Sequence, residues 1–401
     1  MGITIRVTAV SLIILACLCG CSAGGFQGSD NAPQGPAANV LLKSVNGVAS
    51  KGIIRGGDVS IFALNSDGSV GMRLKTTKTN VFGLYSASLN VTGPMLVSVS
   101  GIYTDEATGL ESVIPQDAPL RAAIDTLSSV MTIAVTPLTE LAVRKSMPML
   151  VGGNIAAANK LVSDMFRADI VATQPIDPTA QSFAYVANKQ AQKDYTLALA
   201  AVSQMAHDYY GGSVSDTIAA MNNDLAKGDT LGMVTSGQLK TALTKFLQSS
   251  QNQTGIKDIN ATNLTNVGGG TKVIKLATRG TLEPGSSIYA ITVTVALPLG
   301  VTVRVSDFAL YMADSRAVYA SGVFPTDIYT IGRFVPAVGS EPALLTVLVP
   351  QATGSGLGEF LTIVCDVPIG TSYTAPDFSL RSLKIVNGDG VELQGVSAEI
   401  L

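Results

Sequence analysis

The spacing of apolar residues changes period twice along this chain, and each change marks a different kind of secondary structure. Residues 40–135 alternate apolar and polar positions, residues 136–250 repeat apolar positions at helical spacing, and residues 271–401 return to alternation. Alternation is typical of strands with one buried face, whereas a spacing of three or four residues is typical of amphipathic helices. We therefore predict a multi-domain α+β fold in which two β-sandwiches flank a central helical bundle.

The first β region, 40–135, reads as short strands separated by turns. The apolar run at 59–64 is followed by Asn-Ser-Asp-Gly at 65–68, a sequence typical of the turns that join hairpin strands. Residues 95–100 alternate again. Short strands at such intervals predict a β-sandwich.

The middle region, 136–250, carries helix boundaries that the sequence marks clearly. Thr136 followed by Pro137 predicts a helix start, because threonine caps a helix and proline suits its first turn. The Gly-Gly pair at 211–212 predicts a helix end, and Ser213 predicts the next start. Ser236 precedes a further apolar helical pattern. These signals together predict a compact bundle.

The last region, 271–401, is predicted as a second β-sandwich. Its clearest strand is 359–367, where Leu361, Ile363 and Cys365 share one face. Asn-Gly-Asp-Gly at 387–390, between apolar alternations, predicts a hairpin turn. The segment before this region, 251–270, is polar, rich in asparagine and ends in a glycine run, so we predict an interdomain linker.

The amino-terminal stretch has the layout of a targeting segment. One early positive side chain precedes an apolar run at 7–18, which is too short to span a bilayer as a mature helix. We predict a signal peptide at 1–20. The following residues are mostly Gly, Ser, Pro, Asn and Gln, a composition that cannot bury a core. We therefore predict a flexible tether at 21–39.

The tetrad Leu18-Cys19-Gly20-Cys21 resembles the lipobox of bacterial lipoproteins. The resemblance implies that the mature chain starts at Cys21, which carries acyl chains such as palmitate and anchors the chain in a membrane. The next residue is Ser22 rather than aspartate, which implies the outer membrane. Cys17 and Cys19 would leave with the signal peptide. Cys365 would then be an unpaired thiol, and its apolar strand face predicts burial.

Two further resemblances concern the β regions. Residues 47–48, 56–61, 77, 82–85 and 97–101 resemble the carboxypeptidase regulatory-like, transthyretin-like sandwich. Residues 358–363, 378–380 and 387–393 resemble a cohesin-like sandwich, a group related to some carbohydrate-binding modules. Modules of the first kind are usually spacers without catalytic activity. The cohesin-like resemblance implies fold first and binding second.

Candidate catalytic and metal-binding residues are few. His207 is the only histidine and lies near a predicted helix end, and the sequence has neither a G-x-S-x-G elbow nor an H-E-x-x-H zinc motif. Asp105 and Glu106 share a loop, but a calcium site needs six to eight oxygen ligands. We expect a turn with solvated charges there. We predict no metal site, no cofactor and no enzymatic activity.

The remaining features favour a binding role. The net charge of −3, without a basic block, argues against nucleic acid as a partner. The chain has no tryptophan, so any aromatic platform for a sugar must use tyrosine, and the last region supplies Tyr289, Tyr311, Tyr319, Tyr329 and Tyr373. We predict a non-catalytic, lipid-anchored envelope protein that acts in surface binding or adhesion to a polysaccharide or another envelope protein. The alternatives are a structural or assembly subunit of an envelope complex and, third, a carbohydrate-active enzyme.

Overall fold

The computed structural model describes residues 43–187 and 189–401 and shows a mixed α and β chain, as the sequence predicts. The predicted signal peptide (1–20) and the predicted tether (21–39), which begins at Cys21, lie outside these ranges. Within them, no helix is both long enough and apolar enough to cross a membrane.

The first β region consists of two sheets. One has the strand order β4-β1-β8, and the other has the order β3-β2-β5-β6, with β7 also paired to β5. Strands β2 and β5 run antiparallel, so that Val59 lies opposite Val99 and Ile61 opposite Val97, all of them buried. The strands are β1 (Lys43–Val48), β2 (Ile54–Leu64), β3 (Val70–Lys78), β4 (Leu84–Leu89), β5 (Met95–Thr104), β6 (Glu111–Ile114), β7 (Leu120–Ile124) and β8 (Val130–Thr132).

Gly47 on β1 shows how closely this region is packed. A Cβ at Gly47 would lie 1.9 Å from the Ile133 carbonyl oxygen and 2.7 Å from the Tyr85 hydroxyl, so only glycine fits. The Tyr85 hydroxyl donates to the same carbonyl at 2.7 Å. Burial raises the pKa of Tyr85 well above its usual value.

The helices begin and end mostly where the sequence predicts. The Thr136 hydroxyl accepts from Leu138 and Thr139, and the Ser213 hydroxyl accepts from Asp216. The last helix instead begins at Met233, and the Ser236 hydroxyl donates to the Val267 carbonyl at 3.0 Å. The helices are α1 (Pro137–Ser146), α2 (Gly152–Phe166), α3 (Phe183–Val186), α4 (Gln190–Tyr209), α5 (Val214–Leu225) and α6 (Met233–Leu247).

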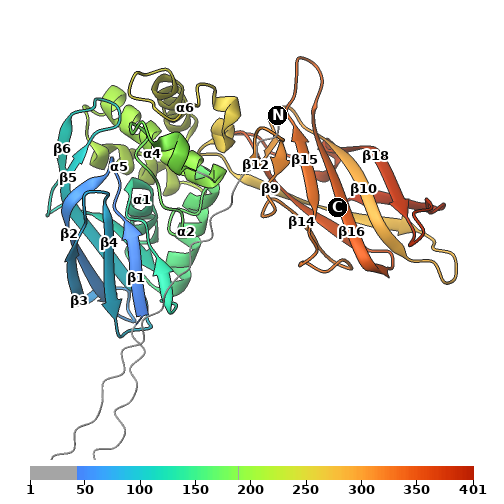
Figure 1. Cartoon of the computed structure of the whole chain (residues 1–401), viewed down its shortest axis with the longest axis horizontal. Coiled ribbons are helices and arrows are strands. Elements are labelled where there is room, and N and C mark those ends of the chain that lie inside the picture. The colour runs from blue at the N-terminus through green and yellow to red at the C-terminus, as the bar shows by residue number, and fades with distance from the viewer. Residues whose placement is uncertain (1–42, 188) are drawn as a thin grey trace, which may run out of the picture. The chain divides into compact units, whose positions relative to one another are not determined.

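A large hydrophobic core joins the first β region to the helices. It runs from Val45 and Val97 in the strands through Tyr195 and Phe246 in the helices. Helices α1 and α2 pack directly against β7, and Figure 1 shows the helices lying beside these strands. The change of period at 135–136 therefore marks a change of secondary structure inside one continuous core.

The segment 251–270 contributes to this core rather than standing free in solvent. It forms two short 3-10 helices, η1 (Ile259–Ala261) and η2 (Asn263–Asn266), and buries Leu264 and Val267. Its polar side chains are used internally, since the Asn252 amide donates to the carbonyls of Leu247 and Ile256. The polar composition that predicts a linker reflects this internal bonding.

The last β region encloses a second core between two sheets. One sheet has the order β12-β13-β15-β16-β10-β18, and the other has the order β11-β17-β9-β19, with β14 also paired to β17. Ile291, Val293 and Val295 are buried, as the alternation predicts. The strands are β9 (Thr271–Gly280), β10 (Ile288–Leu297), β11 (Thr302–Val303), β12 (Val305–Asp307), β13 (Met312–Ala313), β14 (Val318–Ala320), β15 (Ile331–Val335), β16 (Ala343–Ser355), β17 (Glu359–Asp366), β18 (Ser379–Val386) and β19 (Val396–Ile400). A third short 3-10 helix, η3 (Ala375–Asp377), precedes β18.

The predicted turn at 387–390 forms, but the hairpin after it is short. The Asn387 side chain accepts from the backbone of Asp389 and Val391, which closes the turn. A single bridge pairs Val386 with Glu392, and the chain then leaves to pair β19 with β9 in the other sheet. The turn chemistry is local, whereas the partner of the last strand is decided by the packing of the two sheets.

Candidate binding cleft

A cleft of about 700 Å³ lies between helix α2 and the outer face of the sheet that contains β9, β14 and β17. Its helical wall presents Asn159, Lys160 and Asp164, and its sheet wall presents Val273 and Tyr319. Pockets of this size with a few polar groups over an apolar floor are typical ligand sites, especially where two parts of a chain meet.

The sheet wall is held in place by regular pairing. Tyr319 on β14 lies opposite Thr362 on β17, and Val364 two residues on faces the same cleft. Arg316, just before β14, is fixed by a bidentate pair with Asp314, at 3.1 and 2.8 Å. This pair raises the pKa of Arg316. The guanidinium therefore stays charged while more than half of its side chain remains exposed to the cleft.

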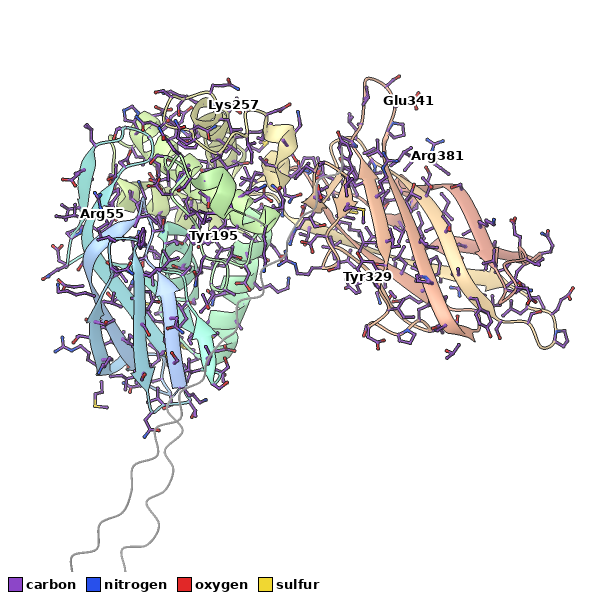
Figure 2. The ribbon with its side chains drawn as sticks, in the orientation of Figure 1. Arg55, Tyr195, Lys257, Tyr329, Glu341 and Arg381 are labelled. Atoms are coloured by element: carbon purple, nitrogen blue, oxygen red, sulfur yellow. The ribbon has the colours of Figure 1, made fainter. Side chains whose placement is uncertain are left out.

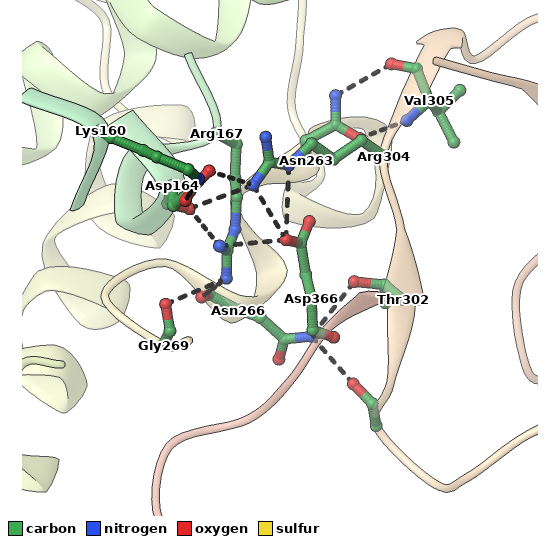
Figure 3. A network of polar contacts seen from close by, with 11 residues as sticks. Lys160, Asp164, Arg167, Asn263, Asn266, Gly269, Thr302, Arg304, Val305 and Asp366 are labelled. Atoms are coloured by element: carbon green, nitrogen blue, oxygen red, sulfur yellow. Dashed lines mark hydrogen bonds and ion pairs between the residues drawn. The ribbon is translucent and has the colours of Figure 1, made fainter. Parts of the chain in front are cut away.

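At the base of the cleft, Arg167 ends helix α2 in an unusual way. It adopts the left-handed conformation, with φ of 59°, where glycine is the usual residue. Its guanidinium lies 3.0 Å from Asp366 and donates to the Asp164 carbonyl and, at 2.6 Å, to the Asn266 carbonyl. Figure 3 shows these contacts converging on one buried side chain. The polar contacts hold Arg167 in a backbone conformation that costs a non-glycine residue free energy.

A second arginine completes the network. Arg304, from the last β region, lies 3.3 Å from Asp164 and 3.4 Å from Asp366. Burial alone would lower the pKa of Arg304, but the charges of these two carboxylates outweigh it and raise the pKa. Burial lowers the pKa of Arg167, because it is completely enclosed. Lys160 pairs with the exposed side of Asp164. The helices and the last β region are thus joined by alternating charges.

One hydrogen-bond donor of this network has no acceptor. In the part of the chain that the structure describes, the buried Arg167 Nε–H has no hydrogen-bond partner. The Asn266 side-chain amide, in contrast, has three acceptors. It donates to the Gly300 carbonyl, the Thr302 hydroxyl and the Asp366 carbonyl, at 2.9–3.1 Å. None of Arg167, Asp366 or Asn266 stands out in the sequence. The one sequence feature that could have pointed to this network is the Asn-rich composition of 259–266, and that composition by itself predicts a linker.

The five candidate tyrosines do not come together. Tyr289 lies on β10, Tyr319 on β14, and the other three lie in separate loops: Tyr311 before β13, Tyr329 before β15 and Tyr373 after β17. Tyr329 is the most exposed, and Figure 2 shows it at the surface. The Tyr373 hydroxyl donates to the Leu299 carbonyl. Of the five, Tyr319 is the one that lines the cleft.

The expectation of a solvated turn at Asp105 and Glu106 is wrong. Glu106 is buried and accepts from the Gly52 backbone N–H and from the Ser203 hydroxyl on α4, both at 2.5 Å. Lys51, completely enclosed, lies 2.8 Å from Asp105 and 3.1 Å from Glu106. Its burial favours the neutral amine, but these two charges outweigh it and raise the pKa of Lys51. The two carboxylates of this loop therefore bond to Lys51 and to helix α4 inside the protein, rather than to solvent.

The other two candidates lie where the sequence places them. Cys365 is buried and unpaired, and burial raises the pKa of its thiol. His207 lies in the last turn of α4, half-exposed, with its ring nitrogen 2.9 Å from Asp208. Among residues 43–187 and 189–401 there is no cluster of three or more His, Cys, Asp or Glu side chains able to hold a metal ion.

Comparison with known proteins gives no relative for this chain: no family model matches it, and no curated protein and no solved structure is significantly similar to it.

Proposed function

We propose that this chain is a non-catalytic, lipid-anchored protein of the cell envelope that binds polysaccharide in the cleft between α2 and β14. The amino-terminal lipid would be on Cys21 and would lie in the outer membrane. In this proposal the two β regions are sandwiches flanking a central bundle, and the helices and the last sheet each supply one wall of the binding site.

The observation that carries the proposal is the chemistry of the cleft lining. Asn159, Lys160 and Arg316 have N–H donors beyond those that bond to Ala123, Asp164 and Asp314. Asp125 offers an acceptor, and Tyr319 offers a half-buried ring beside apolar Val273. Sugars present hydroxyl groups that both donate and accept, together with apolar C–H faces, so a lining of mixed polarity suits them. Lining groups of both signs do not favour a strongly charged ligand.

The carboxylates at the cleft support binding rather than catalysis. Asp164 is engaged by Lys160 and Arg304, and the Asp169 side chain accepts from the backbone N–H groups of Val171 and Ala172. Glycoside hydrolysis needs two carboxyl groups, one of them with a raised pKa so that it can act as an acid. Two of the three aspartates that line the cleft, Asp164 and Asp169, are engaged in this way, which leaves Asp125 without a second carboxylate to act with.

The test is a glycan array probed with the full chain carrying Cys21→Ser, which keeps it in solution. We expect retention on a defined set of envelope glycans, and we expect Tyr319→Ala to abolish it. Tyr329→Ala is the matched control, because it removes an exposed tyrosine of the same region outside the cleft. Binding that survives Tyr319→Ala would contradict the proposal, as would shortened glycan products, which would indicate an enzyme.

A second candidate function, an assembly subunit that docks another protein, is favoured by one specific surface. A groove of about 580 Å³ lies between the turn before β4 and the loop around α3. Val81, Phe82, Leu84 and Val186 line it and are 42–70% exposed. Contiguous exposed apolar side chains are typical of protein contact sites. If Phe82→Ser removed a protein that co-purifies with the chain while glycan retention stayed unchanged, this second function would be supported.

A further inference from the structure

One end of the first β region gathers the turns nearest to Lys43, the residue at which β1 begins. Lys43 lies opposite Leu89 at the end of β4. The next strand begins at Met95, which pairs with Ala63 on β2 and with Ile124 at the end of β7. We call this surface, which lies at the β3 end of the sheets in Figure 1, the basal end. It consists of the segments 65–72, 90–94, 125–130 and 147–152.

The segments of the basal end contact one another. A Cβ at Gly68 would lie 3.0 Å from the Met149 Cα, so the turn between β2 and β3 lies against the segment between α1 and α2. A Cβ at Gly152 would lie 3.5 Å from the Asp125 Cβ, so the same segment lies against the turn after β7. Three of the four segments therefore form one continuous surface.

Leu127 connects the fourth segment and the start of β1 to this surface. Its backbone N–H donates to the Thr92 carbonyl at 3.5 Å, and its carbonyl accepts from the Lys43 ammonium group. The Ser44 N–H donates to the Ser129 carbonyl at 2.9 Å. Strand β1 therefore starts within the basal end.

The basal end exposes apolar side chains and carries little charge. Its four segments contain two acidic side chains, Asp67 and Asp125, and no basic one. Methionine is flexible and adapts to irregular apolar partners, and contiguous exposed apolar side chains are typical of contact sites. Five apolar side chains of this surface are 48–73% exposed: Val70, Met72, Val130, Met147 and Met149.

The place where β1 begins indicates what covers this surface. Cys21 precedes Lys43 in the sequence, so the chain leads from the basal end toward the proposed lipid. The opposite end of β1, at Val48, lies roughly 15–20 Å farther along the strand. A bilayer that holds the lipid is therefore nearest, along the chain, to the basal end.

We propose that the basal end docks on the membrane that holds the lipid of Cys21, with Met72 and Met149 inserted at the boundary between headgroups and acyl chains. The proposal rests on the proposed lipid anchor and is independent of the glycan. Two acidic side chains disfavour anionic lipid, so the surface suits zwitterionic lipid. A few apolar side chains bind a bilayer only marginally, so the lipid is still needed to retain the chain.

The test uses tryptophan fluorescence, because the chain has no tryptophan of its own. The mature chain that the lipobox implies, 21–401, is coupled through Cys21 to a maleimide lipid in phosphatidylcholine vesicles, while Cys365 is buried and stays unreacted. We expect brominated acyl chains to remove roughly half of the fluorescence of Met149→Trp, since an interfacial side chain lies about 5–10 Å deep. Phe82→Trp, in the exposed turn before β4 at the opposite end, is the matched control and should lose little.

The maleimide supplies the anchor, so the result depends neither on lipidation in the cell nor on glycan binding. Val130→Trp is a second reporter in case Met149→Trp does not fold, which circular dichroism checks. Adding Met72→Asp to Met149→Trp should reduce the quenching, whereas adding Val113→Asp, on exposed β6, should not.

Three results would overturn the proposal. The first is equal quenching of Met149→Trp and Phe82→Trp, and the second is quenching that Met72→Asp leaves unchanged. The third is protection of Met149→Trp from aqueous acrylamide in the absence of vesicles, which would show that a second copy of the chain covers the basal end.

Discussion

The guanidinium of Arg167 lies 3.0 Å from the carboxylate of Asp366, and both side chains are at most 1% exposed. Arg167 ends a helix in the middle of the chain, whereas Asp366 ends a strand in the last β region. A buried ion pair does not by itself stabilise a protein much, because both charges lose their hydration. Leaving one partner alone is costly, however, so this pair fixes which surfaces of the two parts can meet.

Removing one member of the pair should therefore destabilise the chain strongly. We expect Arg167→Met to lower the free energy of unfolding by about 3–5 kcal/mol, because the buried Asp366 would keep only the more distant Arg304, at 3.4 Å, and the Asn266 carbonyl would lose its donor. Urea titration followed by circular dichroism measures this change. The control is Arg279→Met, since Arg279 pairs with Glu399 at 2.6 Å but both are about half-exposed. That variant should lose at most about 1 kcal/mol. Equal losses in the two variants would contradict this interpretation of the Arg167 pair.

Glu106→Gln tests the buried loop in the same way. Glutamine keeps an acceptor for the Gly52 N–H but removes one of the two charges beside the enclosed Lys51. We expect a loss of about 2 kcal/mol or more in the free energy of unfolding. Glu111→Gln is the matched control, because Glu111 is largely exposed where it pairs with Arg55. Equal stability of the Glu106 and Glu111 variants would contradict this prediction and would support the solvated turn expected from the sequence.

Local signals in the sequence predict local structure well in this chain. The caps at Thr136 and Ser213 and the turn at 387–390 depend on bonds within a few residues, and all three form. The helix expected to follow Ser236 begins earlier, at Met233, and the Ser236 hydroxyl bonds to Val267, which is distant in the sequence. Secondary structure is thus predictable here wherever its hydrogen bonds stay local.

The candidate site is much less predictable. Arg167, Asp366 and Asn263 gain their roles from partners about 40 to 200 residues away, and no spacing rule connects them. The segment 251–270 looks like a linker because asparagine and threonine favour loops, yet those side chains serve as donors and acceptors between two packed surfaces. Tyrosine composition likewise identifies five candidates, of which only Tyr319 reaches the cleft.

The stability of the chain should depend on pH through Asp194. Asp194 is completely buried on α4, and burial raises its folded-state pKa to about 6, above the usual value of 3.8. The folded state is therefore penalised as the pH rises through this interval and remains penalised above it. We expect the wild type to lose about 1–3 kcal/mol of stability relative to Asp194→Asn between about pH 4 and about pH 7, whatever the stability of the variant itself, because asparagine cannot ionise. Urea midpoints across this range measure the difference. If the wild type instead gained stability relative to the variant between about pH 4 and about pH 6, the prediction would be contradicted.

The proposed anchor makes a separate prediction. Cys21→Ser removes the thiol that would carry the lipid, and a single apolar run of this length does not anchor a mature chain. We expect the variant to move from the membrane fraction to the soluble fraction, measured by fractionation and immunoblotting. Cys19→Ser is the control and should stay with the membrane. Membrane association unchanged in Cys21→Ser would refute lipidation at this residue.

The most direct measurement of the proposed function is a hydrogen-exchange footprint of the chain with a glycan that it retains. We expect added glycan to protect peptides covering 156–164 on α2 and 316–320 around β14, and we expect the protection to disappear in Tyr319→Ala. Protection confined to the exposed face of β15, β16, β10 and β18, or to the groove beside Phe82, would contradict binding in the cleft.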